Sequence, residues 1–498
     1  MITLVGPSLP YGFAKRHGVL LLDAGDVARV GLREGADPKG LIEARRVLGR
    51  PLAVEPLSQA AFDRQLSEIY AGDHLAAADG EDLDMPAGLD SLIDDIPAAA
   101  DLLDTADDAP VIRLINGIIA EAVRTGASDI HLETYESALL VRMRIDGLLR
   151  EALSLNPRIA PLLVSRIKVM ARLDIAEKRV PQDGRIPLAL GGKTLDVRVS
   201  TLPSRGGERV VMRILDKDQA GLTLDRLGMA PDALAAFRAA LAEPHGIILV
   251  PGPTGSGKTT SLYAGLALLN DQTRNILTVE DPVEYAIDGV GQTQVNTKVG
   301  MTFAAGLRAI LRQDPDVVMV GEIRDVETAA IAVQAALTGH LVLSTVHTND
   351  AAGAVTRLRD MGVEPFLLAS TLRLIVAQRL VRRLCEHCRI PEVADKKTAK
   401  LIGAKAGVTV WRPQGCSHCG GSGYIGRIGL YEVMKVGNRL RRLIAAEADE
   451  DALVAAAFDG AGTLGHRARA LVLEGVTSVE EAVRVARQET AADPAEAA

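Results

Sequence analysis

One stretch of this 498-residue chain constrains its fold more than any other. Residues 252–259 read GPTGSGKT, which fits the pattern G-x-x-x-x-G-K-[ST]. An apolar run at 247–250 precedes this stretch, and a helical pattern follows it at 260–269. In such a strand–loop–helix unit, glycines let successive backbone N–H groups turn inward around a phosphate, and the helix N-terminus adds positive potential. The sequence therefore predicts a phosphate-binding loop at the edge of an α/β sheet.

The loop and the first helical turn carry distinct expected roles. Lys258 is expected to reach the β- and γ-phosphates of a nucleotide, and the Thr259 hydroxyl to ligate magnesium. This chemistry predicts ATP and Mg²⁺ as ligands. The nucleotide-binding residues expected here are Gly252, Pro253, Thr254, Gly255, Ser256, Gly257, Lys258, Thr259 and Thr260.

Four short apolar runs recur around this loop, separated by helical patterns. They span residues 247–250, 276–279, 317–320 and 341–344. Continuous apolar strands with helical crossovers indicate a parallel sheet that is covered on both faces. Ligands of such sheets bind at the carboxyl ends of the strands. Polar residues that directly follow a strand are therefore the candidates for chemistry.

That rule separates the acidic residues around the 317–320 strand. Asp314 and Asp316 precede the strand, whereas Glu322 follows it on the side of the phosphate loop. We therefore expect Glu322 to hold the magnesium ion or its bound waters.

The same rule gives a candidate base and a candidate phosphate sensor. Glu280 and Glu284 follow the 276–279 strand, and Glu280 is preferred to orient or deprotonate the attacking water. His347 follows the 341–344 strand and could sense the γ-phosphate.

Phosphoryl transfer also needs positive charge at the γ-phosphate, which arginine side chains often supply. Arg198 and Arg213 are candidates from the region that precedes the predicted sheet. Arg308, Arg312 and Arg324 are candidates within it, and the sequence does not choose among the five.

All four cysteines lie in two C-x-x-C pairs, Cys385 with Cys388 and Cys416 with Cys419. In a reducing compartment this pattern indicates a metal site rather than disulfides. Two thiolate pairs complete a tetrahedron, so a closed structural Zn²⁺ site is expected. His387 and His418 lie inside the pairs as possible substitutes, although a four-cysteine site needs neither.

Between Arg64 and Arg113 the chain carries thirteen Asp and Glu and no Lys or Arg, which more than accounts for its net charge of −8. Such an acidic segment buries too little apolar surface to fold alone, so we expect a flexible linker. The region beyond the cysteines is expected to be helical. The predicted segments are an α/β module (1–78), the linker (79–108), an α+β domain (109–220), the phosphate-loop domain (221–380), a tetracysteine module (381–432) and a helical region (433–498).

Composition excludes some function classes. Aromatic residues make up 3 % of the chain, which disfavours a nucleic-acid binder that stacks bases. The longest stretch without charged side chains, 328–349, is interrupted by Gly339 and His340. It therefore indicates a buried helix, a turn and a buried strand rather than a membrane span. The apolar run near the N-terminus ends at Asp23, too soon for a signal peptide, so a cytosolic protein is expected.

Further motifs give the chain a resemblance to the secretion ATPases that power type II secretion and type IV pilus assembly. They are SDIHLE (128–133), PQDGR (181–185), EDPVE (280–284), VGEIR (320–324), STVHTN (344–349) and QRLVR (378–382). With the phosphate loop and the cysteine pairs, the resemblance covers nearly the whole chain. The opening LPYGFAKRH (9–17) and the short region before residue 109 resemble the type II secretion branch.

The resemblance implies a fold and a set of partners. It implies a RecA-like P-loop NTPase domain preceded by a PAS-like domain, with the nucleotide between the two and with Arg198 and Arg213 directed at it. It implies a homo-hexamer whose segment 1–78 binds the cytoplasmic domain of an inner-membrane platform protein. The cysteine module would approach a polytopic platform protein, and the chain would sit peripherally at the inner membrane.

The resulting hypothesis is a hexameric Mg-ATPase motor for type II secretion that assembles a short pseudopilus. The same chemistry attached to type IV pilus extension is the nearest alternative. A nucleic-acid-driven motor with a zinc knuckle is a second, and a zinc-stabilised scaffold that binds ATP without hydrolysing it is a third.

Overall fold

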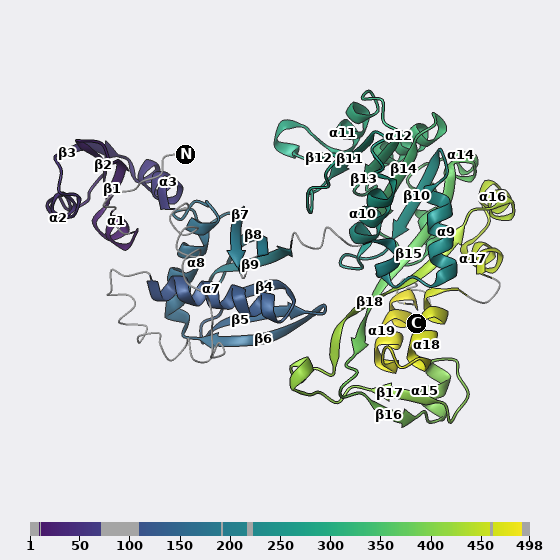
Figure 1. Cartoon of the computed structure of the whole chain (residues 1–498). Helices are drawn as coiled ribbons and strands as arrows, with labels where there is room; N and C mark the ends of the chain where they lie inside the picture. Colours follow the sequence, from purple (N-terminus) through teal and green to yellow (C-terminus); the bar gives the residue numbers. More distant parts are fainter. Residues whose placement is uncertain are drawn as a thin grey trace. The chain divides into compact units, whose positions relative to one another are not determined.

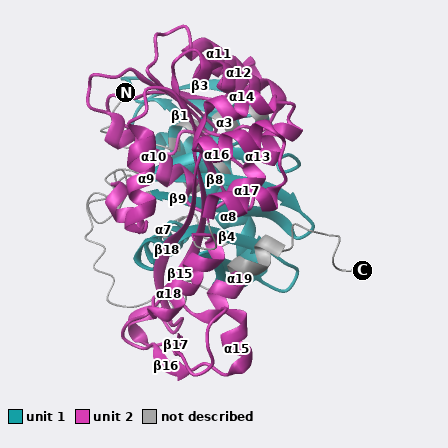
Figure 2. Cartoon of the chain, turned by 90° about the vertical axis from the view of Figure 1, so that its right-hand side faces the viewer, with its two compact units in different colours: residues 1–218 teal, residues 219–498 magenta. Residues whose placement is uncertain are grey.

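The computed structural model describes residues 9, 11–70, 109–190, 193–216, 223–458 and 462–490. It divides into two compact units, residues 1–218 (unit 1) and residues 219–498 (unit 2), which Figure 2 colours separately. The predicted linker 79–108 lies outside the described residues, and so do the ends of several other predicted segments. The segment boundaries therefore stay predictions.

Unit 1 begins with a small three-stranded sheet in the order β1-β2-β3. The first two strands are antiparallel, and the helix α2 connects β2 to its parallel neighbour β3. The last helix of this part, at 59–70, follows Ser58, whose hydroxyl accepts a hydrogen bond from the Ala61 backbone N–H at 3.3 Å. The elements are α1 (Tyr11–His17), β1 (Val19–Asp23), β2 (Ala28–Arg33), α2 (Lys39–Leu48), β3 (Leu52–Leu57) and α3 (Gln59–Tyr70).

The rest of unit 1 is an antiparallel sheet of six strands in the order β6-β5-β4-β9-β8-β7. Side chains of the sheet such as Ile130 and Leu132 join those of α7 and α8 in one hydrophobic core. Figure 1 labels the two helices and the strands. The predicted α+β arrangement is confirmed. Its elements are α7 (Ala109–Arg124), β4 (Ala127–Thr134), β5 (Leu139–Ile145), β6 (Leu148–Leu155), α8 (Ala160–Met170), β7 (Gln182–Leu190), β8 (Lys193–Ser204) and β9 (Gly207–Asp216).

Unit 2 is built on a seven-stranded sheet in the order β12-β11-β13-β14-β10-β15-β18. The first six strands run parallel, as the apolar runs predicted, and β18 is antiparallel to β15. The strands are β10 (Gly246–Pro251), β11 (Ile276–Glu280), β12 (Gly291–Gln294), β13 (Val317–Val320), β14 (Leu341–Val346), β15 (Leu372–Leu384) and β18 (Tyr424–Lys435). The helices beside them are α9 (Pro231–Leu241), α10 (Lys258–Leu269), α11 (Phe303–Ile310), α12 (Val326–Leu337), α13 (Ala351–Asp360) and α14 (Pro365–Thr371). Helix α12 and strand β14 confirm the interpretation of 328–349 as a buried helix, a turn and a strand.

Strands β15 and β18 are 13 and 12 residues long and run on into the segment that holds the cysteines (Figure 1). This extension carries a short antiparallel pair and one helix. They are β16 (Ile390–Val393), α15 (Lys396–Leu401) and β17 (Thr409–Arg412).

The expectation that the chain is helical beyond the cysteines is wrong for residues 424–435, which form strand β18, and the helices begin only after that strand. The apolar pattern of β18 is broken by Glu432, a buried residue whose side-chain oxygens accept the backbone N–H groups of Ala351 and Leu464, both at 3.0 Å. The helices that follow are α16 (Asn438–Ala445), α17 (Glu450–Phe458), α18 (Leu464–Leu473) and α19 (Val479–Thr490). Across the described ranges, no helix combines the length and the apolar character that a bilayer crossing requires.

Candidate nucleotide site and metal centre

The phosphate loop joins the end of β10 to the start of α10, as predicted. Gly255 and Gly257 have φ angles of 78° and 85°, a left-handed region in which glycine is favoured. A Cβ atom on Gly257 would also lie only 2.8 Å from the Gln378 side-chain nitrogen. The local sequence therefore produces a loop whose backbone turns tightly in front of a helix N-terminus.

Lys258 places its charge inside that loop. Its Nζ donates hydrogen bonds to the carbonyl oxygens of Gly252 at 2.7 Å and Pro253 at 3.0 Å, and the residue is 9 % exposed. Burial lowers the pKa of Lys258 to about 8, although attraction to the Glu322 carboxylate opposes the shift. The Lys258 ammonium group is thus held within the loop and is attracted by the negative charge of Glu322.

The carboxyl edge of the sheet brings the other predicted residues to neighbouring strand ends. Counted from β10, the next strands are β14, β13 and β11, and they end at or just before His347, Glu322 and Glu280 respectively. The Gly321 backbone N–H donates to the Val279 carbonyl oxygen at 2.8 Å, which fixes the ends of β13 and β11 side by side. Asp316, at the opposite end of β13, instead accepts the Asn275 backbone N–H at 2.7 Å.

Glu322 and His347 are in direct contact. His347 Nε2 lies 3.0 Å from Glu322 Oε2, and Arg324 forms an ion pair with the same carboxylate. Arg324 Nη1 also lies 3.9 Å from Asp281 Oδ2. A hard carboxylate oxygen from Glu322 and the Thr259 hydroxyl at the start of α10 are donors that suit Mg²⁺. The donor set therefore fits the metal that the sequence predicts.

Glu280 is buried and hydrogen-bonded by groups that the sequence did not identify. The Tyr263 hydroxyl donates to Glu280 Oε2, and the Thr278 hydroxyl and Gln292 Nε2 donate to Oε1 at 2.6 Å and 3.1 Å. Tyr263 lies four residues after Thr259 in α10, a spacing that places the two on one helix face. An aromatic residue at helical spacing normally indicates core packing. The four-residue spacing from Thr259 was therefore the one signal in the sequence that Tyr263 lies near the nucleotide edge.

The arginine candidates of unit 1 lie on its six-stranded sheet. Arg198 is the cross-strand neighbour of Arg213 on β9, and Arg213 is the neighbour of Asp129 on β4. Arg213 Nε donates to Asp129 Oδ1 at 2.9 Å. Burial would raise the pKa of Asp129, but hydrogen bonds from Ser128 and Arg213 outweigh it and lower the pKa. Arg213 is therefore anchored by a buried, ionised carboxylate.

Two arginine candidates of unit 2 have other partners. Arg308 forms an ion pair with Glu327, and Arg312 Nη1 donates to the Arg308 carbonyl oxygen at 2.9 Å. Of the three candidates in this unit, Arg324 is the one that the structure brings to the Glu322 carboxylate.

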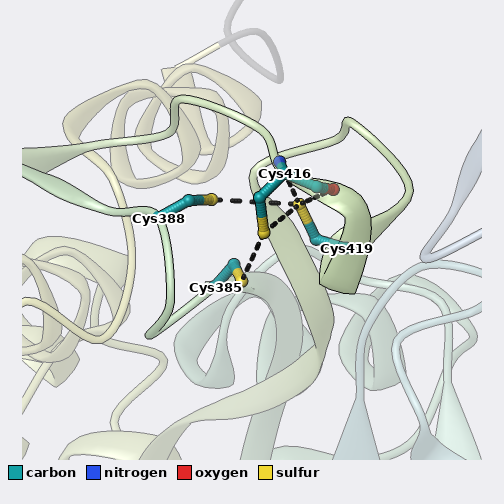
Figure 3. A group of neighbouring side chains, drawn as sticks. All are labelled: Cys385, Cys388, Cys416 and Cys419. Carbon is teal, nitrogen blue, oxygen red and sulfur yellow. Dashed lines mark hydrogen bonds between the residues drawn. The ribbon is translucent and has the colours of Figure 1, made fainter.

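The four cysteine thiols form one group, which Figure 3 shows converging from two chain segments. The Sγ–Sγ distances are 3.9 Å for Cys385–Cys416, 3.9 Å for Cys388–Cys419 and 3.7 Å for Cys416–Cys419. Tetrahedral zinc with bonds of about 2.3 Å separates its sulfur ligands by about 3.8 Å, so the residues fit that metal.

Backbone donors further prepare one thiol for a metal. The N–H groups of Cys416 and Gly423 point at Cys419 Sγ at 3.2 Å and 3.1 Å. Burial opposes ionisation of this thiol, but these backbone donors prevail and lower the pKa of Cys419 to about 6. The exposed rings of His387 and His418 lie beside each other at 4.1 Å between centroids, outside the four-thiol group.

Two family models match this chain. Residues 104–484 match the model described as "Type II/IV secretion system protein", and residues 8–70 match a domain model described under "GSPII protein E". Together the two matches reach from the three-stranded sheet of unit 1 to the last helix of unit 2.

Curated relatives resemble the chain over nearly its whole length. A type II secretion system protein E of Klebsiella pneumoniae is 53 % identical over 487 residues, covering 97 % of each chain. One of Pseudomonas aeruginosa is 54 % identical over 484 residues, covering 97 % of this chain and 96 % of its own. The type II secretion system ATPase E of Vibrio cholerae is 52 % identical over 489 residues, covering 96 % and 97 %.

Solved structures resemble it more distantly. The pilus retraction motor PilT, solved with bound ADP, aligns with a TM-score of 0.51 and 27 % identity over 74 % of this chain and 95 % of its own. The Legionella pneumophila ATPase DotB aligns with a TM-score of 0.56 and 22 % identity over 75 % and 95 %, a likeness of fold alone.

Proposed function

This chain belongs to the type II/IV secretion ATPase family, as a type II secretion ATPase, and from that premise we propose that it acts as a hexameric, magnesium-dependent motor. Its ATP hydrolysis would power pseudopilus assembly and protein export. The observation that carries the proposal is the contact between Glu322 and His347 at the sheet edge that also holds Lys258. The match of residues 8–70 to the GSPII protein E domain supports type II secretion over type IV pilus extension.

In this proposal each residue of the edge has one task. The phosphate-loop backbone and Lys258 bind the β- and γ-phosphates, and Thr259 and Glu322 provide oxygen ligands to magnesium or its waters. Bound magnesium would neutralise charge on the phosphate oxygens. Glu280 orients or deprotonates the attacking water. His347 transmits the state of the γ-phosphate to Glu322 through their 3.0 Å contact.

Arg198 and Arg213 would supply positive charge at the γ-phosphate of a nucleotide. The ion pair with Asp129 supports this role for Arg213, because it limits the positions that a long, exposed side chain can adopt. Opening and closing of a hinge between segment 109–220 and the phosphate-loop domain would then provide the mechanical stroke.

The remaining parts of the chain would connect the motor to the inner membrane. Segment 1–78 would bind the cytoplasmic domain of a platform protein, and the zinc-bound cysteine segment would approach a polytopic platform protein. The chain itself would stay cytoplasmic and peripheral. A pull-down with residues 1–78 against the cytoplasmic domains of type II and pilus platform proteins distinguishes the two systems.

Steady-state phosphate release by the full-length chain tests the chemical roles. We expect Lys258→Ala and Glu322→Gln to lose most turnover, while Glu327→Gln, which removes an exposed carboxylate at the start of α12, retains it. Unchanged turnover in both site variants would contradict the assigned roles.

A further inference from the structure

The helix that follows the phosphate loop also contacts the proposed catalytic carboxylate. Helix α10 starts at Lys258, and its residue Tyr263, which is 1 % exposed, directs its hydroxyl to Glu280 Oε2. Glu280 ends β11, and two strands, β13 and β14, lie between β11 and the strand that leads into the phosphate loop. One buried hydroxyl thus links the phosphate-binding helix to the strand that carries the proposed base.

The donors around Glu280 leave it little freedom. Thr278 and Gln292 donate to Oε1, and Tyr263 donates to Oε2. A carboxylate has about four lone-pair sites, so three donors leave about one for a further partner such as water. Because Tyr263 and Gln292 approach from different elements, the direction of that remaining site is fixed by the fold.

Tyr263 also holds the segment that follows Glu280. Its oxygen accepts the backbone N–H of Glu284 at 3.3 Å and lies 3.3 Å from Gln292 Nε2. Burial, followed by the nearby Glu280 charge, raises the pKa of Tyr263 well above its usual range. The hydroxyl therefore keeps its proton and stays a donor at any pH used for an assay.

We propose that Tyr263 is a positioning residue for ATP hydrolysis: its hydroxyl holds the Glu280 carboxylate and aims the free lone pair of that carboxylate at the attacking water. The assignment rests on the proposed role of Glu280. It predicts that α10 couples phosphate binding to activation of the attacking water. A shift of α10, whose N-terminus binds the phosphates, would also move the Tyr263 hydroxyl that orients Glu280.

The test compares Tyr263→Phe with Tyr285→Phe in the full-length protein. Phenylalanine keeps the ring and removes only the hydroxyl. Tyr285 is a matched control because its ring packs edge-on against Tyr263, with centroids 4.7 Å apart and an interplanar angle of 83°. We expect kcat to fall about 10- to 100-fold in Tyr263→Phe, the scale of a lost hydrogen bond to a charged group, and to stay within about 3-fold in Tyr285→Phe.

Two readouts separate positioning from mere stability. The KM for ATP should stay within about 2-fold, because the phosphate loop is intact, and the acidic limb of the kcat–pH profile should move to higher pH. The direction follows because losing a donor to the carboxylate favours the protonated carboxyl. A Tyr263→Phe variant with unchanged kcat and pH profile overturns the proposal, as does one in which ATP binding and thermal stability are lost together with kcat.

A double-mutant cycle then tests the role of Tyr263 separately from the proposed role of Glu280. If Tyr263 acts through Glu280, Tyr263→Phe should cause no further loss in a Glu280→Gln background. Fully additive losses overturn the role of Tyr263 while leaving Glu280 in place. Full activity of Glu280→Gln alone overturns the proposed role of Glu280 itself.

Discussion

The nucleotide edge and the cysteine centre reach their geometry by different routes. The cysteine centre takes its four thiols from two short turns, each of which needs only a C-x-x-C spacing. The nucleotide edge takes its side chains from the ends of three separate strands, β11, β13 and β14, and from α10. Local spacing therefore specifies the group of four thiols, whereas the strand order of the sheet specifies which side chains meet at the nucleotide edge. Damage to either should leave the other largely intact.

Removal of zinc should give the largest effect and the sharpest test of that independence. Structural zinc contributes about 10–16 kcal/mol to the folding of zinc-finger peptides. We expect one zinc per chain, and we expect Cys385→Ser to unfold the region around β16 and β17 while nucleotide affinity is largely retained. Metal analysis, limited proteolysis and nucleotide titration measure the three quantities.

The control for that experiment is His387→Ala, which changes a side chain outside the thiol group. It should keep both zinc and structure. Absence of zinc from freshly purified wild-type protein would contradict the zinc site. Loss of nucleotide binding in Cys385→Ser would contradict the independence of the two sites.

Lys258→Ala should give the next largest effect, now confined to the nucleotide edge. Removing a preorganised positive group at a phosphate costs about 3–4 kcal/mol of transition-state stabilisation, or about 10²- to 10³-fold in turnover. Phosphate release and nucleotide retention measure the loss, and zinc content should not change. Lys298→Ala, at an exposed position in the short 3-10 helix Thr297–Val299 after β12, is the matched control. Equal losses in the two lysine variants would count against a specific role for Lys258.

The His347–Glu322 contact should give a smaller, coupled effect. We expect His347→Gln to lower kcat about 10-fold, and we expect its effect to shrink in a Glu322→Gln background because the contact partner is already altered. The measurement is a double-mutant cycle on phosphate release. Independent, additive losses would show that His347 acts elsewhere.

The smallest effect concerns the attachment of the cysteine segment. Glu481 on α19 accepts the Arg382 backbone N–H at 3.0 Å and the Arg382 guanidinium at 2.8 Å. Burial would raise the pKa of Glu481, but these bonds and Arg484 outweigh it and lower the pKa below its ordinary 4.5. The folded state thus favours the ionised carboxylate, so the stabilisation is present above pH 4.5 and is lost as pH falls through the lower, folded-state pKa.

Glu481→Gln should therefore lower the free energy of unfolding by about 1–3 kcal/mol at about pH 7, and the difference from wild type should narrow below about pH 4.5. Denaturant titration at several pH values measures it. Glu480→Gln, at the exposed neighbouring position, should have little effect at any pH. A difference that grows toward low pH would contradict the ion-pair account.

The sequence predicted features that depend on local spacing and missed those that depend on strand register. The phosphate loop, the parallel strands and the cysteine pairs all followed from short patterns. Strand β18 was missed because buried Glu432 interrupts its apolar pattern, where it accepts the N–H groups at the starts of α13 and α18. The contact of Arg213 with Asp129 depends on the pairing of β9 with β4, which composition and periodicity do not contain. Tyr263 was missed because core packing and hydrogen bonding to Glu280 look alike in a helical pattern.

The most direct test of the account is phosphate release by the full-length protein with Mg-ATP, measured with and without the cytoplasmic domain of its platform partner while light scattering reports the mass. The account predicts that the partner raises turnover and that the active species has the mass of six chains. A protein that neither retains nucleotide nor releases phosphate in either condition would contradict it.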